Sequence, residues 1–154
     1  MRMFLMGLAA YVLFSLGVVR AEDAPMMAME PVTVDTAAGP VMFTAEIADT
    51  DATRERGLMF RMRMPEDRAM LFDFGVARQV AMWMKNTRMP LDMIFIRADG
   101  SIAGIARNTK PMSTDVLGVG EPVKAVLEVA GGTSDRIGLK AGDMVYHRIF
   151  DNTQ

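Results

Sequence analysis

The polar residues between positions 83 and 92 are the strongest candidates for chemistry in this sequence. Trp83 and Lys85 are two residues apart, so an extended backbone would direct both side chains to one face. Asn86 follows in a loop, and the next apolar segment carries Asp92 near its start. An indole that stacks, an ammonium, an amide and a carboxylate are together suited to hold a small polar ligand.

Arg56 and Glu128 could join this cluster if their elements pack nearby. We therefore expect a binding site for a small polar ligand, or for a partner peptide of the cell envelope, made of Trp83, Lys85, Asn86, Asp92, Arg56 and Glu128. A structural role would explain the same residues. In that role the indole anchors the core, the lysine and Asp92 form an ion pair that closes the turn, and the asparagine satisfies loop backbone groups.

Two other functions stay open. Asp92 and Glu128 could act as the acid and base of an enzyme that cleaves carbohydrate, which requires a separation of about 5 to 10 Å. The 17 methionines suggest Cu(I) binding, because thioethers are soft ligands. They are close in sequence at 26–29, 62–64 and 82–84, although methionine also fills irregular gaps in hydrophobic cores.

Several chemistries have little support. The one histidine, His147, alternates with Val145 and Ile149, which favours a packed, hydrogen-bonded side chain over a catalytic base. The chain has no cysteine, so the usual zinc ligands are lacking and we expect no metal. Gly118-Val119-Gly120 lacks the third glycine and the following helix of a dinucleotide site, so we expect no cofactor.

The first 21 residues are typical of a secretory signal peptide. Arg2 precedes an apolar run from Met3 to Val19, and Val19-Arg20-Ala21 predicts cleavage after Ala21, with Ala24 as a second choice. The protein would then be periplasmic or secreted. An uncleaved segment would act as a membrane anchor, and this segment is the only part for which we expect membrane contact.

The remainder is expected to be one domain. Residues 22–30 would form a flexible leader and residues 31–154 a single β-rich domain. Removal of residues 1–21 would change the formal charge from −2 to −4, because it takes away Arg2 and Arg20. Nucleic-acid binders usually display a basic patch, so we expect no nucleic-acid partner.

Short strands separated by turn residues predict a mainly β fold. Asp99-Gly100 is the strongest hairpin signal, and Asp49-Thr50-Asp51 predicts a helix start that Gly57 ends. Thr133 is expected to cap a second short helix that ends at Gly138. We expect a single-domain sandwich or jelly-roll-like barrel of two short helices and about eight short strands, over residues 32–36, 41–48, 69–74, 80–84, 91–98, 101–106, 123–129 and 143–150.

Several separated motifs carry a resemblance to a known family. They are Arg56-Gly57-Leu58-Met59-Phe60-Arg61, Met70-Leu71-Phe72, Trp83-Met84-Lys85-Asn86-Thr87 and Pro90 to Ile96, followed by Val126-Leu127-Glu128-Val129. In order and spacing they resemble domain-of-unknown-function family 192 (DUF192). The resemblance runs from Val32 to the last strand, and it implies a compact, β-rich, jelly-roll-like domain, often exported, with no established activity.

Overall fold

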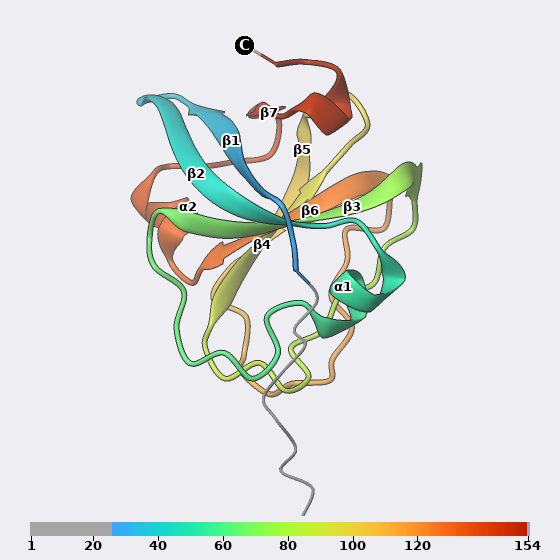
Figure 1. Cartoon of the computed structure of the whole chain (residues 1–154). Coiled ribbons are helices and arrows are strands. Elements are labelled where there is room, and N and C mark those ends of the chain that lie inside the picture. Colours follow the sequence, from blue (N-terminus) through green and yellow to red (C-terminus); the bar gives the residue numbers. More distant parts are fainter. Residues whose placement is uncertain (1–25, 154) are drawn as a thin grey trace, which may run out of the picture.

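The computed structural model describes residues 26–153, and in this range seven strands form one curled sheet with two short helices (Figure 1). The expected signal peptide and residues 22–25 of the expected leader lie outside the described residues. The elements are β1 Met29–Thr36, β2 Gly39–Ala48, α1 Asp51–Arg56, β3 Arg68–Arg78, β4 Leu91–Ile96, β5 Ile102–Ala106, β6 Val123–Ala130, α2 Thr133–Arg136, β7 Val145–Tyr146 and the 3-10 turn η1 Arg148–Phe150.

The strand order is β5-β4-β6-β3-β2-β1-β7. Every neighbouring pair is antiparallel except β2 and β3, which run parallel because α1 lies in the connection between them. β6 comes late in the chain but occupies the middle of the sheet, between β4 and β3. The sheet curls so far that its ends approach each other, since Val145 N donates to Gly100 O and Ile102 N donates to Asp143 O.

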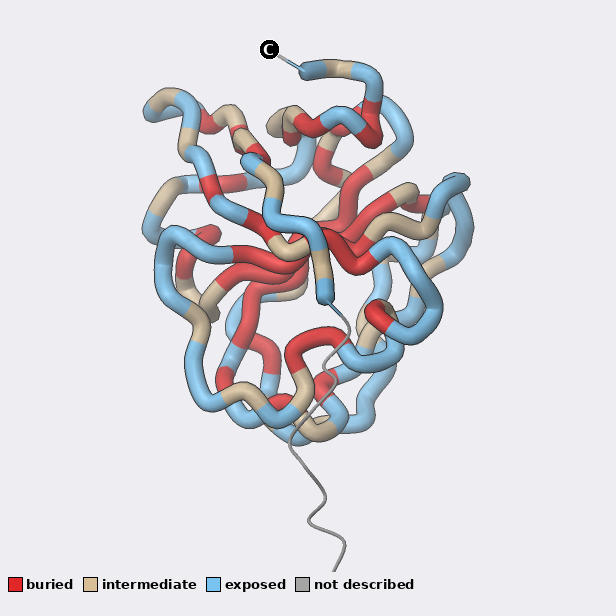
Figure 2. The backbone as a smooth tube through the Cα atoms, viewed as in Figure 1, coloured by how far each residue is buried: buried red, intermediate tan, exposed pale blue. Residues whose placement is uncertain are grey.

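Apolar side chains cover both faces of the sheet, and the buried central strands are visible in Figure 2. One core fills the inside of the curl and includes Ile47, Leu71, Ile94, Leu127 and Phe150. The second core lies on the other face under the long loops and includes Leu58, Met70, Met84, Met93 and Val126. Burial on both faces explains why β4 and β6 are apolar at nearly every position.

The predicted fold class is confirmed: the domain is mainly β, with two short helices. The count is seven strands in one curled sheet where about eight were expected. The Asp99-Gly100 hairpin joins β4 to β5, with Gly100 at φ 87°, and α1 begins after Thr50 and ends at Gly57 as predicted. Neither helix within residues 26–153 has the length and apolarity needed to cross a membrane.

Three predicted boundaries are wrong. The expected strand 80–84 is only an isolated bridge between Met82 and Leu117, because β2 and β6 already occupy both edges of β3. The last strand is reduced to β7, since His147 caps the 3-10 turn that follows. β1 begins at Met29, inside the expected leader, because Met29 and Glu30 pair with Glu46 and Ala45.

Candidate functional site

An open cleft of about 580 Å³ lies on the face of the sheet that carries the second core. Its walls are residues 51–59 around α1, the far end of β3 and the segment 81–87, and Glu128 of β6 contributes to its lining. A volume of this size is within the range of about 300 to 1,000 Å³ that is usual for small-molecule sites.

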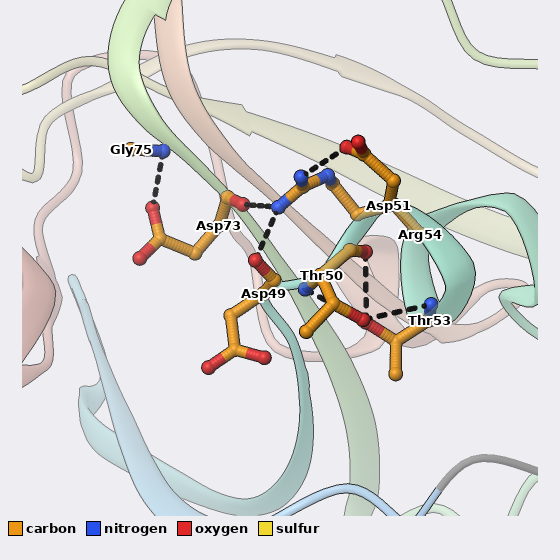
Figure 3. A network of polar contacts seen from close by, with 7 residues as sticks. All are labelled: Asp49, Thr50, Asp51, Thr53, Arg54, Asp73 and Gly75. Carbon is orange, nitrogen blue, oxygen red and sulfur yellow. Dashed lines mark hydrogen bonds and ion pairs between the residues drawn. The ribbon is translucent and has the colours of Figure 1, made fainter.

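The α1 wall is held in place by short polar side chains, shown in Figure 3. Thr50 Oγ1 accepts a hydrogen bond from Thr53 N at 3.2 Å, and Thr53 Oγ1 accepts one from Thr50 N at 2.9 Å. This reciprocal cap satisfies backbone N–H groups that a helix start leaves free. Arg54 Nη1 then donates to the carbonyl oxygens of Asp49 and Asp73, each at 2.7 Å. The helix is thereby fixed to β3.

Trp83 and Lys85 line the opposite wall. The backbone around Met84 is held by neighbouring loops, with Met82 N bonded to Leu117 O at 2.9 Å and Met84 N to Ser113 O at 3.0 Å. Met84 is buried in the second core, and the residues on either side of it border the cleft. The Lys85 ammonium is 5.3 Å from the centroid of the Trp83 ring. Because the Trp83 side chain is 50% exposed, its expected alternative role as a core anchor is excluded.

Arginines complete the rim of the cleft. The Arg56 guanidinium lies 4.9 Å from the centroid of the Phe60 ring, and the Arg78 guanidinium lies 5.1 Å from that of Phe74. Within residues 26–153, neither these arginines nor Lys85 form an ion pair with a carboxylate. Arg78 was not among the residues chosen from the sequence. Arg78 lies an even number of residues after Phe72 and Phe74, so all three can share one face of a strand. The expected strand 69–74 ended too early to show this, because β3 continues through Gly75.

Glu128 is a buried acid at the cleft. It is only 4% exposed and pairs in register with Met70 on one side and Met93 on the other, so it faces the second core. No described residue forms a hydrogen bond or ion pair with its carboxyl group. Burial raises the pKa of Glu128 to about 8, so the group is predominantly a neutral acid at pH 7.

Asp92 does not belong to the cleft, which corrects the predicted site. It is fully buried. Its Oδ1 accepts hydrogen bonds from Asn108 N at 2.8 Å and Gly132 N at 3.1 Å, and its Oδ2 accepts one from Ser134 N at 2.7 Å. Thr133 was expected to cap α2, but Gly132 is the cap residue and has no side chain to offer. The carboxylate of Asp92 performs that task from β4.

The register of β4 and β6 also separates Asp92 from Glu128. Asp92 pairs with Val129, which faces the first core, whereas Glu128 pairs with Met93 of the second core. Neighbouring residues of a strand point to opposite faces, so the two carboxyl groups lie on opposite sides of the sheet. The predicted carbohydrate-cleaving pair is therefore not formed, nor is the alternative ion pair between Lys85 and Asp92.

Asn86 is a turn residue and not part of the cleft lining. It adopts a left-handed backbone conformation with φ 56°, which asparagine tolerates well. Its carbonyl oxygen accepts a hydrogen bond from Phe60 N at 2.8 Å, and its amide nitrogen donates to the Met59 sulfur at 3.8 Å. Asn86 thus contacts the loop after α1, but its side chain bonds a sulfur atom and not the loop backbone groups that the structural interpretation assigned to it.

His147 is packed and hydrogen-bonded, as predicted. It is 4% exposed, its Nδ1 accepts a hydrogen bond from Ile149 N, and its Nε2 lies 2.9 Å from Glu30 Oε2. Arg148 also binds Glu30 through Nε at 2.6 Å and Nη2 at 2.7 Å. Together these contacts fasten the last turn to β1. The Arg148 hydrogen bonds lower the pKa of Glu30.

Within residues 26–153, no three His, Asp or Glu side chains lie close enough to hold a metal ion. The methionine thioethers differ in how far they are buried. Met84 accepts a hydrogen bond from Thr109 Oγ1 at 3.1 Å in the core, whereas Met82 borders the cleft and Met26 is exposed. Cu(I) binding by the methionines stays a prediction.

Comparisons with known proteins show the family by a sequence model and the fold by solved structures. Residues 32–147 match the model of family DUF192, which is described as "Uncharacterized ACR". A solved protein from Sinorhizobium meliloti 1021, provisionally described as a transcription regulator, is 45% identical, with a TM-score of 0.77 over 80% of this chain and 96% of that one. A protein of unknown function from Novosphingobium aromaticivorans DSM 12444 is 36% identical, with a TM-score of 0.78 over 82% and 90% of the two chains. None of the curated proteins matches the chain.

Proposed function

Because the chain belongs to the DUF192 family, whose function is unknown, its role has to be inferred from its own cleft, and we propose that it is an exported binding module that holds a small polar ligand. One observation carries the proposal. Four of the six residues chosen from the sequence, Trp83, Lys85, Arg56 and Glu128, line one cleft although they come from three separate parts of the chain.

The cleft offers complementary contacts to such a ligand. The half-exposed Trp83 ring provides a flat surface, the cations of Arg56 and Lys85 provide charge without a carboxylate partner in the described part of the chain, and Glu128 provides a hydrogen-bonding group below them. Groups that are already in position bind with a smaller entropic cost than groups that must first be ordered.

The helices of this chain do not favour the role of transcription regulator that is given for the Sinorhizobium protein. α1 has six residues and α2 has four, which is too short for a recognition helix that spans part of the major groove. The expected mature charge of −4 also favours a ligand other than nucleic acid.

Trp83 makes the proposal directly testable, because it is the only tryptophan in the chain and it borders the cleft. We predict a saturable change in its fluorescence when the full chain is titrated with at least one of four probes, namely phenylacetate, phenylacetamide, phenethylammonium and glucose. For a charged ligand, Lys85→Gln or Arg56→Gln should change the dissociation constant about tenfold, the size expected for one charge-assisted hydrogen bond.

Lys110→Gln and Arg63→Gln are the matched controls, because both residues are exposed and neither borders the cleft. They should leave the titration unchanged. A set of probes that leaves Trp83 emission constant, or an effect of the control variants as large as that of the cleft variants, would count against a binding site here.

Export is the second part of the proposal, and it is supported by the apolar run from Met3 to Val19 and by Val19-Arg20-Ala21. We predict that the chain, expressed in a bacterial host that has a periplasm, is recovered from that compartment with Glu22 as its first residue. Mass spectrometry of the intact protein measures this. Ala21→Leu should block cleavage at this bond or shift it to the bond after Ala24. Recovery of uncleaved chain in the membrane fraction would instead identify an anchor.

A further inference from the structure

The Glu128 carboxyl is an unusual group for the lining of a cleft. It is more than nine-tenths buried, borders the cleft and has no hydrogen-bond partner among residues 26–153. A polar group at a cleft that has no partner in the protein loses free energy unless water or a ligand bonds to it. An acid left unsatisfied at a cleft is therefore available for a partner that is not part of the folded chain.

We propose that the ligand is a small organic carboxylate with an apolar body, whose charged end is held by the Glu128 carboxyl group and by the rim cations. This inference rests on the proposed binding function and names its ligand class. The Glu128 hydroxyl donates a hydrogen bond to the ligand carboxylate, and the apolar body of the ligand lies against Trp83, Phe72 and Phe74, which border the same cleft.

The charges around the cleft favour an anion. Besides Glu128, the charged residues that border it are Asp51, Arg54, Glu55, Arg56, Arg78 and Lys85. Arg54 is paired with Asp51 at 2.6 Å, which leaves three cations and one carboxylate, Glu55. A site with this surplus attracts a ligand anion and repels a ligand cation. The three cations each lie over an aromatic ring, so they are held near the rim before a ligand arrives.

The protonation state of Glu128 determines which charged group of a ligand can bind to it. Because burial raises its pKa to about 8, it is protonated at pH 7 and can donate. A hydrogen bond from an acid to a carboxylate is charge-assisted and stronger than one between neutral groups. An ammonium ligand could use only the weaker acceptor of the neutral acid, because an ion pair would require Glu128 to ionise among Met70 and Met93, which burial opposes.

The test compares three probes of nearly equal shape, phenylacetate, phenylacetamide and phenethylammonium, by calorimetric titration of the full chain between pH 6 and pH 9.5. Phenylacetate should bind most tightly at pH 6 to 7. Its dissociation constant should rise about tenfold per pH unit once Glu128 ionises above pH 8, because the donor is lost and a like charge appears. The neutral amide should show no comparable rise.

Variants separate the acid from the rest of the cleft. Glu128→Gln keeps a neutral donor, so phenylacetate should bind within about threefold of the parent at pH 7, and its dissociation constant should stay flat up to pH 9.5. Glu128→Leu removes the donor and should weaken binding at pH 7 by tenfold or more, an effect of about 1.4 kcal/mol. Asp115→Asn, an exposed acid away from the cleft, is the matched control.

The outcomes distinguish the two proposals. Tighter binding of phenethylammonium or phenylacetamide at pH 7 would keep the binding site and overturn its ligand class. If the dissociation constant of phenylacetate changed neither with pH nor in the Glu128 variants, the acid would not contact the ligand. Failure of all three probes to release or absorb heat would contradict the binding function itself.

Discussion

Asp92→Ala is expected to lower the free energy of unfolding by about 3 to 5 kcal/mol, among the largest effects of any single substitution in this chain. The Asp92 carboxylate is fully buried and accepts backbone hydrogen bonds from Asn108, Gly132 and Ser134. Its removal leaves three N–H groups without an acceptor. These groups join β4 to the loop after β5 and to the start of α2, so the loss weakens two connections together.

Urea denaturation followed by far-UV circular dichroism measures this effect. Asp92→Asn should cost less than alanine, because an amide keeps one acceptor oxygen. Asp143→Ala is the matched control: its carboxylate accepts a backbone hydrogen bond from Lys140 at 2.9 Å on the surface, and its loss should cost about 1 kcal/mol. An Asp92→Ala protein as stable as the control would show that Asp92 does not fasten these segments.

Glu128→Gln is expected to raise stability at neutral and alkaline pH, by roughly 4 kcal/mol at pH 8. In the folded protein the pKa of Glu128 is about 8, whereas in the unfolded chain it is near 4.5. Below pH 4.5 both states are protonated. Between pH 4.5 and 8 the unfolded chain ionises while the folded protein does not, so unfolding releases a proton and stability falls as the pH rises.

The substitution should abolish this part of the pH dependence, because glutamine does not titrate. Denaturation midpoints measured from pH 4 to pH 9 for the parent and the variant give the difference directly. Glu55→Gln, an exposed acid at the same cleft, should leave the slope almost unchanged. If Glu128→Gln destabilised the protein at pH 8, or left the parent slope intact, the acid would have to be charged and compensated in the folded state.

Local patterns predicted most of the strands. Val41, Phe43, Ala45 and Ile47 alternate with Met42, Thr44 and Glu46 along β2, and Gly100 supplies the positive φ that the β4–β5 hairpin requires. The segment 80–84 shows the limit of this reasoning. A short apolar run after turn residues indicates a strand there, but a strand also needs a free edge, and only the order of the complete sheet reveals that both edges of β3 are taken.

The site was predictable where it depended on local spacing. Trp83 and Lys85 share a face because they are two residues apart. Both side chains border the cleft, although the segment is not a strand. Asp92 and Glu128 could not be placed in the same way. Whether they meet depends on the register between β4 and β6, two strands separated by residues 97–122, and a shift of one residue would have placed them opposite each other on the same face.

The position of β6 has a consequence for how the chain acquires its structure during translation. Until residues 123–130 have been made, β1, β2 and β3 form one group and β4 and β5 another, and the strand that joins them is missing. Both groups then present unpaired apolar edges, at β3 and at β4. A nascent chain in this state is prone to pair with other chains, so a chaperone that keeps it apart until synthesis ends would increase the yield of folded protein.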